Sequence, residues 1–332
     1  MKFWWLAPLC LLAAVYSLTL GHYSVCVEKV GWLILNPLSP SGDEDAVARQ
    51  VVLMVRLPRV LMAFGAGATL ALAGAALQGV FRNPLVDPHI IGVSSGAALG
   101  GALAILFGLS SWLLLGLSLM GGITSLLCVF ILGGGAQKRG GLLSLVLAGL
   151  IVSGFFSACV SLVQYLADSE ETLPSIVFWL LGSFATASFA KLAILYIPLL
   201  LAGGILLVLR WRLNLLSLDD VDARALGINT GYLRWWIILL CALLVAAQVA
   251  VSGAIAWVGL VVPHLARQLG GPDHRRLLPL SAGLGGLYML LIDDLARTLS
   301  QGEIPLGILT ALIGAPLFAG VWLQRQRMMW HE

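Results

Sequence analysis

The chain has 332 residues, of which 60% are hydrophobic and only 11% are charged, and its mean hydropathy is +0.98. A soluble globular protein carries about a quarter charged residues, so this composition excludes a water-soluble fold and indicates an all-α, polytopic membrane protein. The formal net charge of +3 is too small to suggest a nucleic acid as a partner, and no arginine-rich or aromatic-interleaved strip supports one.

Membrane-spanning helices are expected wherever about 20 apolar residues follow one another, the length that crosses the hydrocarbon core. The first stretch, Phe3 to Leu20, has no A-x-A-like cleavage site and begins with Trp4-Trp5, so we expect a retained span and not a signal peptide. A polar loop from Gly21 to Val55 follows, and Ile176 to Ser188 is a shorter apolar piece that need not cross. The other nine expected spans cover about 57–81, 89–109, 112–132, 142–166, 192–209, 236–251, 253–269, 277–299 and 304–323.

The basic residues indicate the direction of these ten spans. Ten crossings place both termini on one side of the membrane. With the N-terminus in the cytoplasm, 13 of the 19 Lys and Arg residues fall on the cytoplasmic side. Cytoplasmic loops carry an excess of these residues, so the sequence predicts that both termini are cytoplasmic.

Glycine is abundant, with 38 residues, many of them at small-residue spacing. Gly67 and Gly74 belong to a small-residue flank of the second span, and Gly96 and Gly100 belong to a similar flank of the third span. Because lipid offers no hydrophobic drive for helix association, small residues that let backbones approach closely are typical of helix contacts in membranes. We therefore expect tight packing along these flanks.

One polar segment, Arg210 through Trp235, separates two apolar stretches. Ser217 is a candidate helix N-cap, the acidic residues after it suit the first turns of a helix, and Gly227 is placed to end that helix. A short capped helix between two spans must lie at the membrane surface, where another protein can bind it. The alternative is a solvated loop that only connects the spans.

The residues offer no site for catalysis. No P-loop, zinc-protease or serine-hydrolase motif occurs, and the five cysteines show no metal spacing, so we expect no cofactor and no metal. Asp293 and Arg297 stand four positions apart in the ninth span, so they can form an intramembrane ion pair on one helix face. Asp294 lies one helical step away, where it can face a polar cavity. A structural and a functional role for these charges both stay open.

Four stretches are similar to signature regions of a known family. The chain resembles the FecCD permease family, the membrane subunits of bacterial ABC importers for iron–siderophores, haem, vitamin B12 and, in some members, molybdate. The stretches are RLPRVLMAFGAGATLALAGAALQGVFRNPLVDPHIIGVSSGAALG from Arg56, ALGI from Ala225, VSGAIAWVGLVVPHLARQLGGPDHRRLLPLSAGLGG from Val251 and DDLARTLSQGEIPLGILTALIGAPLF from Asp293.

This resemblance implies a type II ABC importer permease fold with about ten transmembrane helices, in a single permease domain over residues 1–332. It also implies a homodimer in the bacterial inner membrane, with the translocation path at the dimer interface. Two separate ATPase subunits would bind ATP on the cytoplasmic side, and a periplasmic substrate-binding protein would dock on the other. The chain itself would be a transport subunit and not an enzyme.

Roles for individual residues follow from the same resemblance. The segment 210–235 matches the cytoplasmic coupling segment that sits in a cleft of the ATPase. Arg56, Arg59 and Arg297 match positions that dock the binding protein, where an arginine fork suits a carboxylate. The expected coupling residues are Ser217, Asp219, Asp220, Asp222, Arg224, Ala225, Leu226 and Gly227.

Gating residues are implied in two further turns. Asn83, Pro84 and Leu85 correspond to the turn after the second span, and Leu142 and Leu143 correspond to the turn between the fourth and fifth spans. Two leucines at the latter place would make an apolar constriction that closes by excluding water.

The residues leave the substrate open. An anionic iron–siderophore is the first choice because that branch of the family is the most populous, and haem, cobalamin and molybdate are the alternatives. A protein of another class, an ion-coupled secondary transporter that works through Asp293 and Asp294, would transport without any ATPase. An integral-membrane enzyme is disfavoured, since no cluster of His, Asp and Glu gathers on one membrane face.

Overall fold

The computed structural model describes residues 3–21, 23–36, 43–134, 141–218, 223, 226–227, 229–300 and 302–329. These residues form helices, turns and connections, and none of them lies in a β-strand, so the all-α prediction is confirmed for this part of the chain. In chain order the elements are α1 (Leu6–Thr19), α2 (Val27–Leu35), α3 (Asp43–Arg49), the π-helix η1 (Gln50–Arg56), α4 (Leu57–Val80), the 3-10 helix η2 (Pro88–Ile91), α5 (Val93–Leu106), α6 (Ser111–Leu132), α7 (Gly141–Leu166), α8 (Thr172–Leu180), α9 (Phe189–Pro198), the π-helix η3 (Leu199–Gly203), α10 (Gly204–Leu215), α12 (Thr230–Ser252), α13 (Val258–Gly270), α14 (His274–Thr298) and α15 (Leu306–Met329).

Six helical segments of the described chain are long and apolar enough to cross a bilayer, and each corresponds to one expected span. Three other expected spans hold shorter apolar helices, namely α1, α5 and the Leu306–Gly320 part of α15. The remaining expected span, 253–269, holds α13, which has 13 residues. Every expected stretch therefore contains a helix, whereas the count of ten crossings stays a prediction. The six segments are Ala46–Val80, Ser111–Leu132, Leu142–Leu166, Phe189–Leu215, Thr230–Ser252 and His274–Thr298.

The prediction of a plain polar loop from Gly21 to Val55 is wrong. This region holds α2 and α3, and η1 runs without a break into α4. Its apolar residues cause the difference, because Val30, Leu33 and Val52 are fully buried in one cluster that also contains residues of α4. Their burial stabilises short helices that the interspersed charges make inconspicuous in the sequence.

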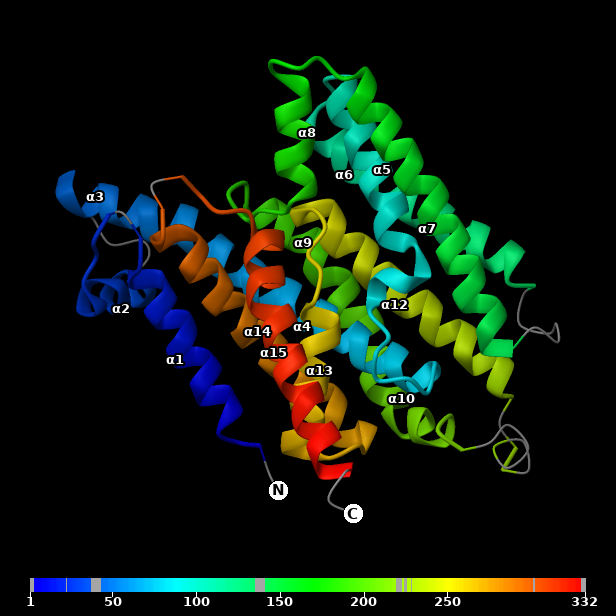
Figure 1. The fold of residues 1–332 in the computed structure, drawn as a ribbon. Helices are drawn as coiled ribbons and strands as arrows, with labels where there is room; N and C mark the ends of the chain where they lie inside the picture. Colours follow the sequence, from blue (N-terminus) through cyan, green and yellow to red (C-terminus); the bar gives the residue numbers. More distant parts are fainter. Residues whose placement is uncertain are drawn as a thin grey trace.

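The central helix of the subunit is α4, which crosses the middle of the bundle and is buried along nearly its whole length (Figure 1). Two glycines explain how neighbouring helices come so close. A Cβ on Gly67 would lie 2.0 Å from the carbonyl oxygen of Gly285 in α14, and one on Gly74 would lie 1.9 Å from that of Gly259 in α13. The backbones are therefore in direct contact, and the predicted tight packing along this flank is confirmed.

Close backbone contacts at glycine residues also join α5 to α6. A Cβ on Gly96 would lie 2.4 Å from the carbonyl oxygen of Gly121, and one on Gly100 would lie 2.0 Å from that of Leu117. The hydroxyl of Ser118 adds a bond across this contact by donating to the carbonyl oxygen of Ala97 at 2.9 Å. The small-residue flank predicted for the third span thus packs as expected.

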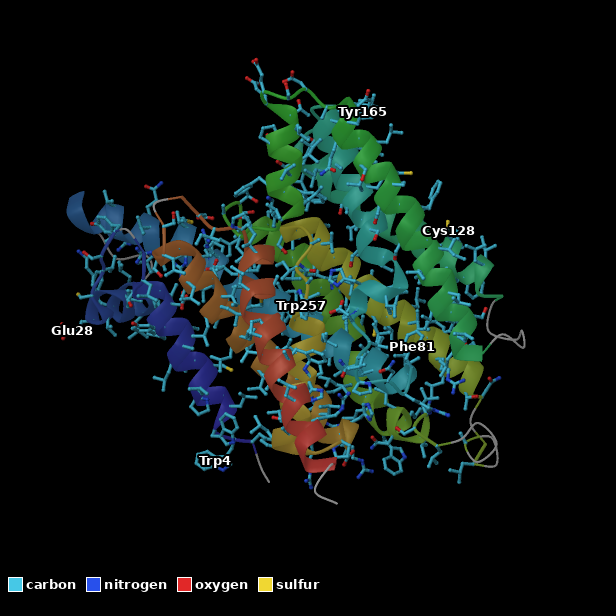
Figure 2. The ribbon with its side chains drawn as sticks, in the orientation of Figure 1. Trp4, Glu28, Phe81, Cys128, Tyr165 and Trp257 are labelled. Carbon is cyan, nitrogen blue, oxygen red and sulfur yellow. The ribbon has the colours of Figure 1, made fainter. Side chains whose placement is uncertain are left out.

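The two ends of the bundle carry different features. The first turns of α1 and α14 and the last turns of α10 and α15 lie at one end, which we call the terminal face (Figure 1). The start of α4 and the end of α14 lie toward the other end, which we call the opposite face. Trp4, 77% exposed, lies near the terminal face and Tyr165, 85% exposed, lies far from it (Figure 2). Exposed Trp and Tyr at the two ends of apolar helices are typical of membrane–water interfaces.

Candidate functional site

The turn after α4 has a defined shape. Arg82 has a φ angle of 50°, which is uncommon for a residue with a side chain. The backbone N–H of Asn83 donates to the carbonyl oxygen of Gln78 at 3.2 Å. The side-chain oxygen of Asn83 accepts from the backbone N–H of Leu85 at 2.9 Å. Pro84 lies between them and cannot continue a helix, so the expected gating turn is held by local bonds with Leu85 54% exposed.

Arg82 joins this turn to the end of α10. Its Nε donates to the carbonyl oxygen of Leu216 at 2.7 Å, and its Nη2 donates to that of Leu218. Carbonyl groups at a helix C-terminus lack the donors of a following turn and favour a cation, so the arginine satisfies them. The gating turn and the entry to the polar segment 210–235 are therefore one bonded unit, which sequence reasoning did not foresee.

The connection between α4 and α5 is held to its neighbours by buried polar groups. The side-chain Nε2 of Gln78 donates to the carbonyl oxygens of Val86 at 3.2 Å and Gly259 at 3.4 Å, which ties α4 and α13 to this connection. The His89 Nδ1 and Asp87 Oδ1 atoms lie 2.5 Å apart. Burial alone would lower the pKa of His89, but the carboxylate of Asp87 raises it, and the same contact lowers the pKa of Asp87.

Three of the expected coupling residues lie in the described chain. Ser217 is in the turn that follows α10, with its backbone N–H 3.2 Å from the carbonyl oxygen of Asn214. Leu226 is 61% exposed, and Gly227 has a φ of 81°, the left-handed conformation that a residue ending a helix needs. The other five expected coupling residues fall outside the described residues, and they are Asp219, Asp220, Asp222, Arg224 and Ala225. The N-cap bond predicted for Ser217 also falls outside the described residues.

A second set of bonds ties the end of α10 to the start of α14. The side-chain amide of Asn214 donates to Asp273 Oδ1 at 2.6 Å, and its oxygen accepts from the backbone N–H of His274 at 2.9 Å. Hydrogen bonds from the backbone of Arg275 and from Asn214 lower the pKa of Asp273, so it stays a carboxylate. The guanidinium of Arg275 in turn lies 4.1 Å from the ring centroid of Trp211. The last turn of α10 is thus fixed from two sides.

The second expected gate lies at the start of α7. Leu142 packs against the core cluster that contains Phe81 and Val86, whereas Leu143 is 69% exposed. The hydroxyl of Ser144 donates to the carbonyl oxygen of Gly133 at 3.3 Å, which holds the start of α7 to the end of α6. The structure therefore brings Leu142 to the same cluster as the flanks of the first gating turn and leaves Leu143 open on the surface of the chain.

A buried cluster of charges connects three helices at the opposite face. Arg59 Nη2 lies 2.9 Å from Asp293 Oδ1, and Arg297 Nε lies 3.1 Å from Asp293 Oδ2, so the expected pair of Asp293 with Arg297 is present. Asp294 accepts a hydrogen bond from Ser17 Oγ at 2.6 Å and contacts Arg297. It therefore belongs to the cluster, and it is 8% exposed. The cluster ties α1 and α4 to α14.

The three arginines expected to dock a binding protein lie at this face and are buried. Arg56 is 5% exposed, and Arg59 and Arg297 are each 7% exposed. Arg56 Nη1 donates to the carbonyl oxygens of Leu18 at 2.9 Å and Thr19 at 3.2 Å. Their guanidinium groups are thus bonded to acceptors of their own chain, and a docking partner would have to replace those acceptors. The docking role itself stays a prediction.

Glu303 is a member of this region that sequence reasoning missed. It follows α14, its side chain is 34% exposed, and it contacts Arg59 Nη1. The backbone nearby joins the connection between α8 and α9, since the N–H of Leu306 donates to the carbonyl oxygen of Gly182 at 2.9 Å. A contact across 244 positions of sequence leaves no local pattern by which it could have been found.

Within the described residues, no group of three or more His, Cys, Asp or Glu is arranged to bind a metal ion. What the arrangement can do is mechanical. The connections of the terminal face are bonded to one another and to the ends of α4, α10 and α14, so a displacement of one is transmitted to the others.

The apolar bundle with its six candidate spans defines a polytopic membrane protein. The model of the FecCD transport family matches residues 9–325, and the chain belongs to this family. It is 54% identical over 313 residues to the molybdate import system permease protein of Haemophilus influenzae, covering 94% of this chain and 92% of that protein. It is 42% identical over 287 residues to the hemin transport system permease protein of Yersinia pestis, covering 83% of each chain. The resemblance to the family is therefore confirmed.

A solved structure agrees with this assignment. It is an inward-facing conformation of a transporter assigned to the metal-chelate type of ABC transporter, with 51% sequence identity and a TM-score of 0.87, covering 96% of this chain and 97% of that one. The Fe(3+) dicitrate transport system permease protein of Escherichia coli is 39% identical over 329 residues, covering 97% of each chain. The chain is thus an ABC importer permease, and its role is in transport.

Proposed function

We propose that the chain forms a homodimer and that substrate crosses the membrane at the dimer interface. Two separate ATPase subunits, bound at the terminal face, drive this transport. The observation that carries this proposal is the bond of Arg82 to the carbonyl oxygens that follow α10. No P-loop motif occurs in the sequence, so the proposal assigns ATP binding to separate subunits. A force on the polar segment would reach the gating turn directly through this arginine.

The coupling role of residues 210–235 rests on their position. They begin in the last turns of α10 and end in the first turns of α12, and Leu218 and Leu226 are 40% and 61% exposed, so apolar side chains are available to a partner. The first part of this segment is bonded to the turn after α4 through Arg82 and to the start of α14 through Asn214. Arg224→Glu should then stop substrate uptake and leave ATP hydrolysis by the assembled transporter in place. Unchanged uptake would remove the coupling role.

For the substrate we propose a small oxyanion of the molybdate type. The 54% identity to a molybdate permease, over 94% of this chain, supports this choice. Sequence reasoning placed an anionic iron–siderophore first. A metal chelate is the second candidate, favoured by the 51% identity to a chain of the metal-chelate type. Haem and cobalamin are weaker alternatives.

The test is uptake into proteoliposomes that contain the chain, the ATPase and the binding protein from neighbouring reading frames. We expect ATP-dependent uptake of radioactive molybdate that unlabelled tungstate inhibits and a ferric chelate does not. Uptake of the ferric chelate with no uptake of molybdate would reverse the order of the two substrates. The matched control is a transporter whose ATPase subunit cannot hydrolyse ATP.

The same vesicles test the rival class, an ion-coupled secondary transporter. Asp293 and Asp294 are both held in contact with arginines, which leaves neither carboxylate free to carry an ion. We therefore expect uptake to persist when a protonophore removes the ion gradient and to stop without the ATPase. Uptake without the ATPase that the protonophore abolishes would establish the rival.

A further inference from the structure

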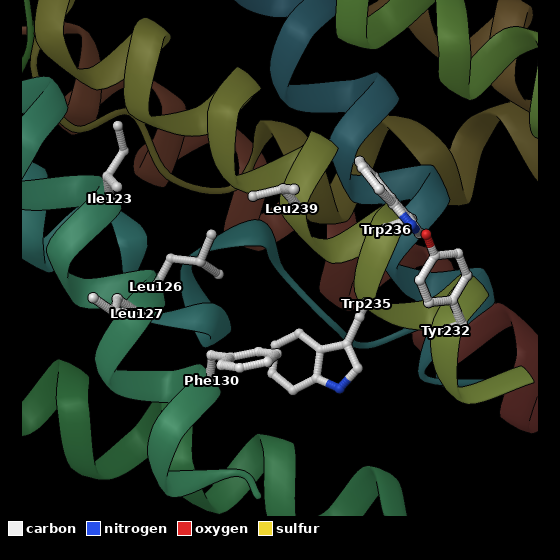
Figure 3. Close-up of a pocket in the computed structure, with 8 residues that line it drawn as sticks. All are labelled: Ile123, Leu126, Leu127, Phe130, Tyr232, Trp235, Trp236 and Leu239. Carbon is white, nitrogen blue, oxygen red and sulfur yellow. The ribbon is translucent and has the colours of Figure 1, made fainter. Parts of the chain in front are cut away.

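Two cavities adjoin each other where α12 begins, and neither is part of the machinery described above. The first lies between α6 and α12, has a volume of about 410 Å³ and is lined entirely by apolar and aromatic side chains (Figure 3). Phe130 and Trp235 meet in it edge to face, with ring centroids 4.6 Å apart. The lining residues are Ile123, Leu126, Leu127, Phe130, Tyr232, Trp235, Trp236 and Leu239.

The second cavity lies between α10 and α12 and has a volume of about 470 Å³. It shares Tyr232 and Trp236 with the first cavity. These two residues stand four positions apart on α12, so they lie one above the other and form a ridge between the cavities. The lining residues are Ile205, Leu209, Arg212, Gly227, Asn229, Tyr232, Leu233, Trp236 and Leu240.

Both cavities lie toward the ends of candidate membrane spans. The helices that form them are three of the candidate spans, and the cavities lie where α6 and α10 end and α12 begins. Tyr232 is 58% exposed and Trp236 is 45% exposed, with ring centroids 5.9 Å apart. Trp and Tyr gather at the level of lipid headgroups, so this ridge indicates where the hydrocarbon region begins.

One cation in the second cavity lacks a partner. Arg212 is exposed, and its guanidinium group forms no hydrogen bond or ion pair with any residue in the part of the chain that the structure describes. Its neighbours are engaged: Arg210 Nη1 donates to the carbonyl oxygen of Arg275 at 3.4 Å, and Arg275 lies over the ring of Trp211. Arg212 is therefore the basic group at this site that is available to an anion.

We propose that the two cavities together bind one anionic phospholipid. Its phosphate would pair with Arg212, its glycerol would rest against Tyr232 and Trp236, and one acyl chain would enter each cavity. An apolar cavity open to the bilayer is suited to acyl chains, and a basic group at its mouth selects an anionic headgroup. A second copy of the chain is disfavoured as the occupant, because it would have to place a carboxylate at Arg212 and also fill the cavities on both sides of the ridge formed by Tyr232 and Trp236.

The headgroup half of the proposal is tested by native mass spectrometry of the purified chain with dioleoylphosphatidylglycerol or dioleoylphosphatidylcholine. We expect one tightly retained phosphatidylglycerol per chain, and Arg212→Gln should weaken it about fivefold, the contribution of one basic residue near an anionic lipid. Arg210→Gln is the matched control, since it removes the same charge from the same helix end outside the cavity. Equal weakening by both variants, or equal binding of both lipids, would overturn the proposal.

The acyl-chain half is tested by filling the first cavity. Leu239→Trp should weaken phosphatidylglycerol binding, whereas Leu243→Trp should not, because Leu243 is a partly exposed residue one turn further along α12 that does not line the cavity. Binding that both variants leave unchanged would contradict an acyl chain in this cavity. If Leu239→Trp instead separates a dimer into single chains and no lipid is retained, the surface is an interface between copies and the proposal is wrong.

Discussion

The Nε of Arg82 lies 2.7 Å from the carbonyl oxygen of Leu216, although 134 positions separate them in the sequence. This contact joins the gating turn after α4 to the polar segment after α10. Two features that are independent in the sequence are thus bonded to each other, and under the proposed function a push on the segment would move the turn. In the proposed function, coupling would pass through the guanidinium group of Arg82, whose backbone adopts an uncommon φ of 50°.

Removal of this guanidinium should uncouple the transporter. In the assembled complex we expect Arg82→Ala to retain ATP hydrolysis and to lower the substrate transported per ATP about tenfold, as expected from losing charge-assisted hydrogen bonds of about 1.5 kcal/mol. Arg82→Gly should lose coupling to the same degree, although glycine adopts the φ of 50° without strain. Arg276→Ala, which removes an exposed arginine of α14 outside the proposed coupling segment, is the control. Restored coupling in the glycine variant would show that backbone strain, and not the guanidinium, is what matters.

The charge cluster at the opposite face predicts a large loss of stability for Asp293→Asn. The side chain of Asp293 is fully buried between Arg59 and Arg297, so its neutralisation leaves two buried cations without their shared anion. We expect a destabilisation of about 3–5 kcal/mol, measured by thermal unfolding in detergent. Glu303→Gln is the control because that side chain is 34% exposed, and it should cost less than about 1 kcal/mol. Similar losses of stability in both variants would contradict the role of Asp293 as the shared anion of Arg59 and Arg297.

The close contact of α4 with α13 predicts that Gly74→Ala disrupts the bundle. A methyl group there would lie 1.9 Å from the carbonyl oxygen of Gly259, and a backbone atom cannot move aside as a flexible side chain can. We expect little folded protein in the membrane, measured by size-exclusion of a fluorescent fusion. Gly116→Ala in α6 meets nothing within 4 Å and should be neutral or stabilising by about 0.5–1 kcal/mol. Normal yield of folded Gly74→Ala would refute the contact.

The pair of Asp87 and His89 predicts a stability that depends on pH. The raised pKa of His89 means that its contribution is complete below about pH 6.5 and is lost as the pH rises through the folded-state value. The lowered pKa of Asp87 means that its contribution is complete above about pH 3.8 and is lost as the pH falls through its folded-state value. The ion pair therefore stabilises most between these limits.

His89→Asn should accordingly lower the unfolding temperature at about pH 6 and have a smaller effect at about pH 9. The stability difference is expected to be up to about 1 kcal/mol, since both side chains are partly exposed. Thermal unfolding of the wild-type chain and the variant at both pH values measures it. A difference that does not change with pH would mean that the histidine acts through packing alone.

The positions of the helices could be predicted because each depends on local composition. A run of about 20 apolar residues must become a helix in a bilayer, where no water satisfies the backbone. Each of the ten expected stretches contains a helix for this reason. The region from Gly21 to Val55 was predicted wrongly because its helices depend on burial of Val30, Leu33 and Val52 against α4, which composition does not reveal.

What the sequence by itself determined is the class of protein, the location of the helices, the glycine flanks and the pairing of Asp293 with Arg297, which lie one turn apart on the same helix. Only the tertiary structure decided which distant groups meet. It bonds Arg82 to the end of α10, buries the three outer arginines among acceptors of their own chain, and leaves Arg212 beside two apolar cavities. The physical reason is that a contact between residues far apart in the chain is set by how whole helices pack, and no short pattern encodes that packing.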